Sequence, residues 1–326
     1  MKEINCIGVL TSGGDAPGMN AAVRAVVRAC LHYNKRVIGI NNGYKGLLEG
    51  DVIEMSYTSV SRIISKGGTV LKTARCTEFK NPDVVLQASK KAQEIGMDAL
   101  VVIGGDGSFR GALDLSKHGI NVIGIPGTID NDIACSDYTI GFDTALNTVC
   151  EAIDKIRDTC SSHDRCNVVE VMGRNAGYLA LHAAVATGAE GYLLPEIPFE
   201  ISNICEKIKE YISLGKSHFI VVAAEGVTKD LGGADSISKI IEEKTGVETR
   251  STVLGHIQRG GNPTVKDRII ASQMGLKAVE LLLEGKNKRV VVTKDDKIID
   301  FDITEALNMK KDFEFELARL SDYLNY

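Results

Sequence analysis

Short apolar runs alternate with longer amphipathic segments along almost the whole chain. Apolar residues within the longer segments recur at helical spacing, as at Phe142, Ala145, Val149 and Ile153. The short runs are rich in valine and isoleucine, with no polar alternation, which is typical of parallel strands covered by helices on both faces. We therefore expect α/β domains with mainly parallel sheets. The runs with strand character occupy residues 4–10, 36–40, 98–105, 121–126, 167–172, 218–225 and 289–293.

The length of the chain, 326 residues, favours two domains. No linker or low-complexity tract marks a boundary, and a single division near residue 140 is the best estimate from composition. The net charge of −5 argues against nucleic acid or an acidic membrane as the main partner. A phosphorylated substrate would then need local basic residues.

Cysteine usage and hydropathy predict a cytoplasmic location. None of the eight cysteines forms a CxxC pair, which argues against zinc-ribbon and thioredoxin-type sites and favours reduced thiols. No segment approaches the roughly 20 apolar residues of a membrane span. The first apolar stretch is too short for a signal peptide.

Three polar clusters follow predicted strands. They are "TSGGDAPG" (11–18), "GGDGS" (104–108) and "PGTIDND" (126–132). Ligands of open parallel sheets bind beyond the carboxyl ends of the strands. We therefore expect these clusters to converge on one site.

The "GGDGS" cluster predicts a phosphate site at the start of a helix. Unpaired N–H groups and the helix dipole suit phosphate there, and Asp106 is a natural Mg²⁺ ligand. The alternative is a plain strand-to-helix turn capped by Asp106. No Walker A motif is present, because Glu210 stands where the "GKS" at 215–217 would need the first glycine.

The "TIDND" segment (128–132) contains two carboxylates, those of Asp130 and Asp132. In an extended chain Thr128, Asp130 and Asp132 would face the same way, so one carboxylate could orient a metal while the other accepts a proton. The alternative is an Asx-rich turn that caps the next helix. Six basic residues in conspicuous contexts could bind phosphate, although any one alone is more often a surface residue: Arg75, Arg165, Arg174, Arg250, His256 and Arg259.

Seven sequence blocks in order resemble the bacterial type of ATP-dependent 6-phosphofructokinase over nearly the whole chain. They are "GVLTSGGDAPGMNAA", "LVVIGGDGS", "PGTIDNDI", "YTIGFDTA", "VVEVMGRNAG", "ETRSTVLGHIQRGG" and "DRIIAS". The resemblance implies transfer of a phosphoryl group from MgATP to the 1-hydroxyl of fructose 6-phosphate, a step of glycolysis. It also implies two similar three-layer α/β/α domains. The ATP-binding domain would comprise 1–140 and 257–307, and the fructose 6-phosphate-binding domain 141–256 and 308–326.

The resemblance also assigns roles to individual residues. Asp130 would be the catalytic base, supported by Thr128 and Arg174, and Mg²⁺ would be held by Asp106 and Asp132. ATP would contact Gly14, Arg75, Cys76, Gly105, Asp106, Gly107 and Ser108. The sugar phosphate would contact Thr128, Ile129, Asp130, Arg165, Met172, Gly173, Arg174, Glu225, Arg250, His256, Ile257, Gln258 and Arg259.

In this family Arg165 and Arg250 reach the site from a neighbouring subunit, which implies a homotetramer. An effector site for ADP and phosphoenolpyruvate is implied at Arg24, Arg28, Arg157, Gly188, Ala189, Glu190, Lys216, Ser217 and His218. Tyr57 and Leu214 stand where relatives commonly carry basic residues, which puts the effector response in doubt. The stretch at 226–240 predicts an extended surface loop.

Three alternative functions are weighed. Pyrophosphate-dependent relatives resemble "GGDDS" and "PKTID" at the two loops, whereas this chain has Gly107 and Gly127, which favours ATP. NAD and diacylglycerol kinases share "GGDG" but lack the "GHIQRGG" and "MGRNAG" blocks. A non-catalytic nucleotide-binding regulator is the third alternative, and intact Asp106, Asp130 and Arg174 argue against it.

Overall fold

The computed structural model describes residues 3–324, which form two compact units. The first unit comprises Met1–Ile129, Ile133–Thr144 and Arg259–Lys311. The second comprises Asp130–Asp132, Ala145–Gln258 and Asp312–Tyr326. Within the described residues, no helix is both long enough and apolar enough to cross a membrane.

The first unit is built on a seven-stranded sheet with the order β11-β10-β5-β4-β1-β2-β3. Its five central strands are parallel, and the edge strands β3 and β11 are antiparallel to their neighbours. The valine- and isoleucine-rich central strands are buried almost throughout, as expected for strands covered on both faces. The strands are β1 (Cys6–Thr11), β2 (Arg36–Ile40), β3 (Val52–Glu54), β4 (Ala99–Gly104), β5 (Asn121–Pro126), β10 (Arg289–Lys294) and β11 (Lys297–Asp302).

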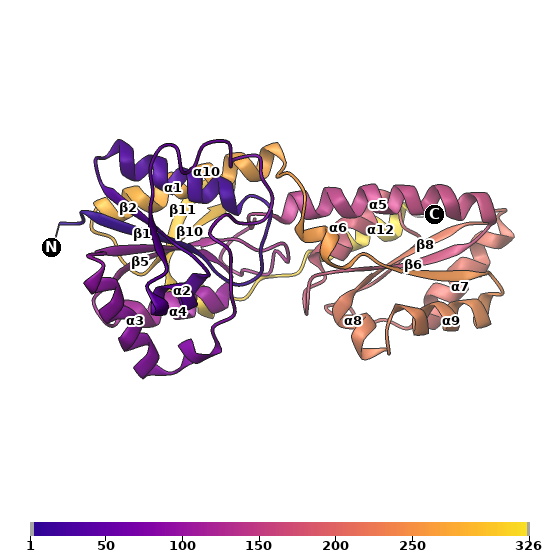
Figure 1. Cartoon of the computed structure of the whole chain (residues 1–326). Coiled ribbons are helices and arrows are strands. Elements are labelled where there is room, and N and C mark those ends of the chain that lie inside the picture. Colours follow the sequence, from indigo (N-terminus) through magenta and orange to yellow (C-terminus); the bar gives the residue numbers. More distant parts are fainter. Residues whose placement is uncertain (1–2, 325–326) are drawn as a thin grey trace. The chain divides into compact units, whose positions relative to one another are not determined.

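Helices cover both faces of this sheet (Figure 1). One face carries α1 (Met19–His32) and α10 (Val265–Leu283), which pack against each other. The other face carries α2 (Gly43–Glu49), the 3₁₀ helix η1 (Thr77–Lys80), α3 (Pro82–Glu94), α4 (Asp106–Ser116) and α11 (Ile303–Asn308). Phe109, Leu115 and Leu100 lie in the apolar core beneath this second layer.

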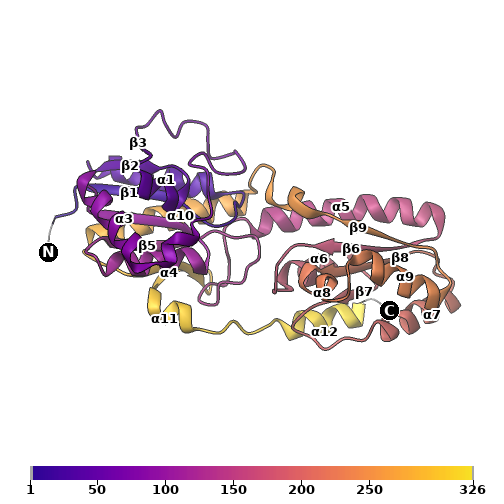
Figure 2. The same ribbon diagram turned by 60° about the horizontal axis from the view of Figure 1, so that its bottom comes forward.

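The second unit has a four-stranded sheet with the order β7-β8-β6-β9, parallel throughout. In Figure 1, α5 and α6 lie above this sheet and α7 and α9 below it, and Figure 2 shows the same unit turned about the horizontal axis. The strands are β6 (Cys166–Val171), β7 (Gly191–Leu193), β8 (Phe219–Ala224) and β9 (Thr249–Val253). The helices are α5 (Phe142–His163), α6 (Tyr178–Thr187), α7 (Ile201–Ser213), α8 (Glu225–Asp230), α9 (Ala234–Thr245), η2 (Gly255–Arg259) and α12 (Phe315–Leu324).

The predicted α/β class with mainly parallel sheets is confirmed, and all seven predicted runs form strands. The predicted loop at 226–240 is wrong, because this stretch forms α8 and the first half of α9. Ala234, Ile237 and Ile241 recur at helical spacing and are buried, so the segment contributes to the core instead of extending from the surface. All eight cysteines are described as free thiols, and six of them are buried.

Candidate active site

The three glycine-rich loops of the first unit lie side by side at the carboxyl ends of β1, β4 and β5. These strands are neighbours in the sheet, and backbone hydrogen bonds continue past their ends. The Ser12 N–H donates to the Ile103 carbonyl at 2.9 Å, and the Gly127 N–H donates to the Gly104 carbonyl at 3.0 Å. The sheet therefore brings together the loops whose convergence the sequence predicts.

The "GGDGS" loop presents the start of α4 to solvent. Gly105 precedes the helix with extended backbone, Asp106 is its first residue, and both Asp106 and Gly107 are exposed. Ser108 is buried, and its carbonyl accepts a hydrogen bond from the Tyr44 hydroxyl at 2.5 Å. The exposed N–H groups at this helix start suit a phosphate group.

Gly107 has no packing reason to be glycine in the described structure. A Cβ built there would meet no atom within 4 Å, so the protein itself would tolerate a side chain. At Gly127, in contrast, a Cβ would lie 3.1 Å from side-chain atoms of Ile103 and Met19. Gly107 therefore leaves open space directly in front of the candidate phosphate site.

Asp106 has the chemistry of a magnesium ligand. Loss of hydration raises the pKa of this carboxyl above its usual value, while Arg110 one turn later opposes the shift. Among residues 3–324 no cluster of three or more acidic, histidine or cysteine side chains could hold a metal by itself. Mg²⁺ takes one or two carboxylates and completes its shell with water and substrate phosphates, so the Asp106 carboxylate suits such a site.

Arg259 packs on the loop after β1 within the first unit. Its guanidinium leaves no room for a Cβ at Gly14 and donates to the Asp15 carbonyl at 3.1 Å. In the same loop, the Gly13 carbonyl accepts a hydrogen bond from the Thr73 hydroxyl at 2.8 Å. The sequence did not point to Thr73, because a single threonine in a loop carries no signal.

The segment 128–132 is not the extended chain that the alternation of Thr128, Asp130 and Asp132 requires. Asn131 has a φ of 50°, in the left-handed region that asparagine tolerates, and the chain bends there. Asp130 is 2% exposed, whereas Asp132 is exposed. The shared-face argument for these three residues is therefore wrong. The alternative, a turn that caps the next helix, is not formed either, because α5 begins only at Phe142.

In the second unit, Arg174 approaches Asp130. Its Nε lies 3.6 Å from the Asp130 Oδ2, and its side chain is 60% exposed while that of Asp130 is 3% exposed. Arg174 has a φ of 54° and lies just beyond β6. A cation with one side on a buried carboxylate and the other open to solvent can attract a second anion.

Neighbouring strands place further predicted residues at this carboxyl edge. The ends of β6 and β8 pair at Val171 and Ala224, so Glu225 at the start of α8 lies beside the 172–174 segment. Gly226 packs directly on the Arg174 carbonyl, where a Cβ would overlap it. The β9 strand ends at the same edge and leads into His256, Ile257 and Gln258.

Gln258 holds the backbone of this edge in place. It is fully buried, its Oε1 accepts the Met172 N–H at 3.1 Å, and its Nε2 donates to the Gly255 carbonyl at 3.0 Å. Gly173 has a φ of 143°, and a side chain there would overlap the Ala176 carbonyl. His256 and Ile257 are exposed, so they are accessible to a ligand.

Arg165 and Arg250 lie at the opposite, amino edge of the same sheet. Arg165 precedes β6, and Arg250 is the second residue of β9. Both bind Glu248, with Arg165 Nε 2.8 Å from its Oε2 and Arg250 Nη2 2.6 Å from its Oε1. Hydrogen bonds from Arg165 and then Arg250 lower the pKa of Glu248.

The predicted effector residues of the second unit also gather at its amino edge. Glu190 is 2% exposed and accepts from Lys216 Nζ at 2.5 Å and Arg157 Nη1 at 3.3 Å. Arg157 also donates to the Thr187 and Gly188 carbonyls. Ala189 is buried, whereas Ser217 is exposed and His218 is half-buried.

The effector residues of the first unit lie on α1. Arg24 and Arg28 are half-buried. The guanidinium of Arg28 lies 4.8 Å from the centre of the Tyr57 ring and donates to the Tyr57 carbonyl at 3.3 Å. Tyr57 therefore holds this arginine by a cation–π contact, where a basic residue would repel it.

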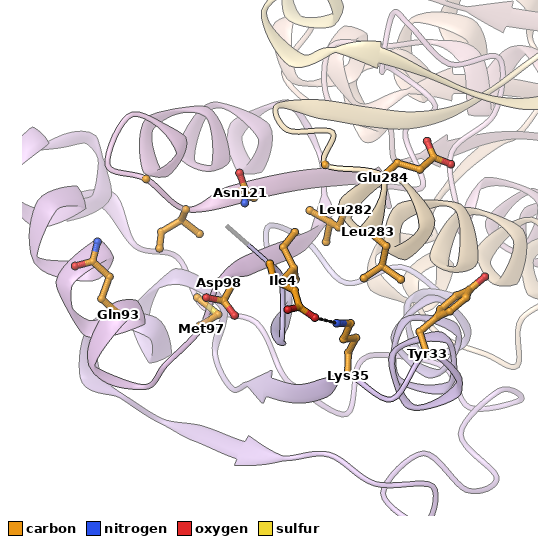
Figure 3. Close-up of a pocket in the computed structure, with 14 residues that line it drawn as sticks. Ile4, Tyr33, Lys35, Gln93, Met97, Asp98, Asn121, Leu282, Leu283 and Glu284 are labelled. Carbon is orange, nitrogen blue, oxygen red and sulfur yellow. Dashed lines mark hydrogen bonds and ion pairs between the residues drawn. The ribbon is translucent and has the colours of Figure 1, made fainter. Parts of the chain in front are cut away.

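A cavity of about 770 Å³ in the first unit lies away from the glycine-rich loops. Its walls include Ile4, Asp98 and Asn121, which precede or begin β1, β4 and β5 (Figure 3). Lys35 and Glu3 form an ion pair of 3.3 Å within it. The cavity is therefore at the amino edge of the sheet and is separate from the candidate active site.

The first unit thus offers a phosphate-type helix start, and the second a buried carboxylate with an arginine. Together these features define an α/β protein of the phosphoryl-handling class. A family model described as "Phosphofructokinase" matches residues 6–282. The chain belongs to the phosphofructokinase family.

Individual relatives agree over the full length. The chain is 57% identical over 321 residues to an "ATP-dependent 6-phosphofructokinase" of Thermoanaerobacter sp. (strain X514), covering 98% of this chain and 99% of the relative. It is 54% identical over 319 residues to "ATP-dependent 6-phosphofructokinase 1" of Clostridium perfringens, with the same coverage.

Solved structures share the fold. A phosphofructokinase from Saccharomyces cerevisiae aligns with a TM-score of 0.87 and 34% identity over 98% of this chain, which spans about half (48%) of the yeast chain. A pyrophosphate-dependent phosphofructokinase from Nitrosospira multiformis aligns with a TM-score of 0.88 over 97% of this chain and 90% of its own, but at 22% identity it supports the fold alone.

Proposed function

We infer that this chain transfers the γ-phosphoryl group of ATP to the 1-hydroxyl of fructose 6-phosphate in glycolysis, giving fructose 1,6-bisphosphate and ADP. The observation that carries this inference is the full-length identity of 57% to an ATP-dependent 6-phosphofructokinase. The test is a coupled assay with Mg²⁺, fructose 6-phosphate and either ATP or pyrophosphate. Turnover with ATP supports the inference, and turnover with pyrophosphate alone would replace it with the other branch of the family.

Asp130 is the proposed catalytic base. It would accept the proton of the sugar 1-hydroxyl as that oxygen forms its bond to the γ-phosphorus and the bond from phosphorus to the ADP oxygen breaks. Arg174, 3.6 Å from Asp130 and largely exposed, would neutralise charge on the transferred group. The buried environment of Asp130 and the fixed backbone of 172–174 support these roles.

The first unit is the proposed ATP-binding part. The N–H groups at the start of α4 would hold phosphate, with Gly14, Arg75, Cys76 and Ser108 around the nucleotide. Mg²⁺ would be held by Asp106 and Asp132 and would supply charge neutralisation at the phosphates. The open space at Gly107 supports ATP as donor, because a carboxylate at that position would project toward the nucleotide.

The second unit is the proposed fructose 6-phosphate-binding part, with its site completed by a neighbouring subunit. Met172, Gly173, Glu225 and His256 lie at one edge of the sheet, whereas Arg165 and Arg250 lie at the other. The six-residue strand β6 separates Arg165 from the carboxyl edge by roughly 20 Å, and Arg250, which pairs with Asn167, lies four residues or roughly 13 Å from Val171. Both distances exceed the length of an arginine side chain. This arrangement supports a homo-oligomer, which we propose is a tetramer.

We also propose that ADP and phosphoenolpyruvate act as effectors at the basic residues around Glu190 and on α1. The pairing of Glu190 with Arg157 and Lys216 and the stacking of Arg28 on Tyr57 support a weakened response, because these groups already have partners. An ADP titration of fructose 6-phosphate saturation tests this. Eight free thiols suit a reducing compartment, and we propose the cytoplasm.

A further inference from the structure

Asp267, a buried aspartate at the start of α10, is not among the residues of the proposed active site. Asp267 is fully buried and lies in the first turn of α10, which Thr264 caps by accepting the Asp267 N–H. Burial raises the pKa of its carboxyl, and hydrogen bonds from Thr144, Tyr138 and Gly141 oppose that shift. A buried carboxylate is costly unless donors surround it, so its partners explain its presence.

Among the described residues, one short segment, 138–144, donates hydrogen bonds to this carboxylate. Its Oδ1 accepts from the Tyr138 hydroxyl at 2.5 Å and from the Gly141 N–H at 2.7 Å. Its Oδ2 accepts from the Thr144 N–H at 2.9 Å and from the Thr144 hydroxyl. Burial and Asp267 raise the pKa of Tyr138, so this hydroxyl stays protonated and donates.

The clamped segment is tied in turn to the loop that carries the proposed base. Thr139 is fully buried, and its hydroxyl donates to the Thr128 carbonyl at 2.7 Å. Backbone pairing supports the same contact, since the Ile140 N–H donates to the Pro126 carbonyl at 3.0 Å. Thr128 stands two residues before Asp130 in the chain.

We propose that Asp267 is a positioning residue for phosphoryl transfer: it clamps 138–144, and Thr139 passes this constraint to the 128–130 loop. This inference rests on the proposed function, because the loop matters for turnover only if Asp130 is the base. Asp267 touches no reacting atom. It acts by fixing the position of Asp130, and displacement of a catalytic group by about 1 Å lowers the rate about 100-fold.

The test uses the full-length protein and three variants of decreasing severity. Asp267→Asn replaces one acceptor oxygen with a donor facing N–H and O–H groups, Tyr138→Phe removes one donor to Asp267, and Thr139→Val removes the hydroxyl that donates to the Thr128 carbonyl. Thr245→Val is the matched control, because its hydroxyl also donates to one backbone carbonyl at 2.7 Å, that of Ile241 in α9.

Turnover, both Michaelis constants and the thermal unfolding midpoint are measured for each variant. We expect kcat to fall about 10- to 100-fold in Asp267→Asn and Thr139→Val while KM for ATP and fructose 6-phosphate changes less than about threefold. A double variant that combines Asp267→Asn with Thr139→Val should lose little more kcat than Asp267→Asn alone, because both changes act through one path. Thr245→Val should keep kcat whatever its midpoint.

Several results would overturn the inference. One is a folded Thr139→Val or Asp267→Asn protein with kcat within about twofold of wild type. Another is a loss of kcat that appears equally in Thr245→Val and follows the unfolding midpoint. If Asp267→Asn does not fold, Thr139→Val and Tyr138→Phe decide by the same criteria. An inactive wild-type protein would instead contradict the proposed function, so the two failures are distinguishable.

Discussion

Asp130 is the residue on which the proposed chemistry depends most directly. We expect Asp130→Ala to lose roughly 10²- to 10⁴-fold in kcat, the usual contribution of a general base, with little change in KM for either substrate. Steady-state kinetics on the purified variant measure this. The control is Asp114→Asn, whose carboxylate forms a surface pair of 2.7 Å with Lys117 and should leave turnover unchanged. Near-normal turnover in Asp130→Ala would remove Asp130 as the base.

Gly107 is the residue that bears most on the choice of phosphoryl donor. A methyl group there meets nothing within 4 Å, so Gly107→Ala should fold and bind ATP almost normally. Gly107→Asp adds a negative charge beside the proposed phosphate site and should lower kcat/KM for ATP at least about tenfold, about 1.4 kcal/mol. Comparing the two variants separates charge from bulk. An equal effect of both would contradict the electrostatic explanation.

At the scale of elements, the start of α4 places the Arg110 guanidinium one turn after the Asp106 carboxyl. The pKa of Asp106 is raised by loss of hydration and held down by Arg110. Because a proposed metal ligand must be ionised, Mg²⁺ activation should weaken as the pH falls through this raised pKa, at a higher pH than an ordinary aspartate allows. Removing Arg110 raises the pKa further, so Arg110→Gln should move the acid limb to higher pH.

The measurement for this prediction is the pH dependence of the apparent Mg²⁺ affinity in wild type and Arg110→Gln. Lys117→Gln is the control, since Lys117 lies just beyond the far end of α4 and pairs with Asp114. An acid limb that stays in place or moves to lower pH in Arg110→Gln would show that Asp106 does not control Mg²⁺ binding.

The elements differ in how well the sequence predicts them, and burial explains the difference. Fully buried strands such as β4 are continuous apolar runs and are predicted correctly. The edge strand β9 reads "TRSTV", is mostly outside the core and shows no apolar run, so it is missed. The 226–240 segment is predicted as a surface loop because it is longer than in the family that the chain resembles. It instead forms helices, which Gly232 and Gly233 separate.

The sequence predicts those parts of the candidate site that lie at the ends of predicted strands. Parallel topology places the three glycine-rich loops together, and the sequence therefore locates them. Contacts between distant positions leave no local pattern. Gln258 holds Met172 from 86 residues away, and Asp267 binds Tyr138 from 129 residues away. Side-chain networks of this kind require the tertiary structure.

At the scale of the whole molecule, a single chain separates groups that the proposed reaction needs in one place. Arg165 and Arg250 share Glu248 at the amino edge of the second sheet, and 172–174 lie at its carboxyl edge. The basic residues around Glu190 also lie at the amino edge. The surface that would complete a neighbour's substrate site is therefore next to the surface proposed for effectors. Effector binding could thus change the position of Arg165 and Arg250 directly.

Complementation between two inactive variants tests whether sites are shared between subunits. Asp130→Ala lacks the base, and Arg250→Ala lacks a group that would serve the neighbouring site, so each alone should be nearly inactive. In a mixed pair related by two-fold symmetry, one site receives both defects and the other receives neither. Random reassembly of equal amounts should therefore restore roughly a quarter of wild-type turnover. Mixing Asp130→Ala with Arg174→Ala gives the control, because both of these residues lie at the carboxyl edge of one chain and no intact site can form. Activity in the first mixture that equals the sum of its separate components would mean that each chain completes its own site.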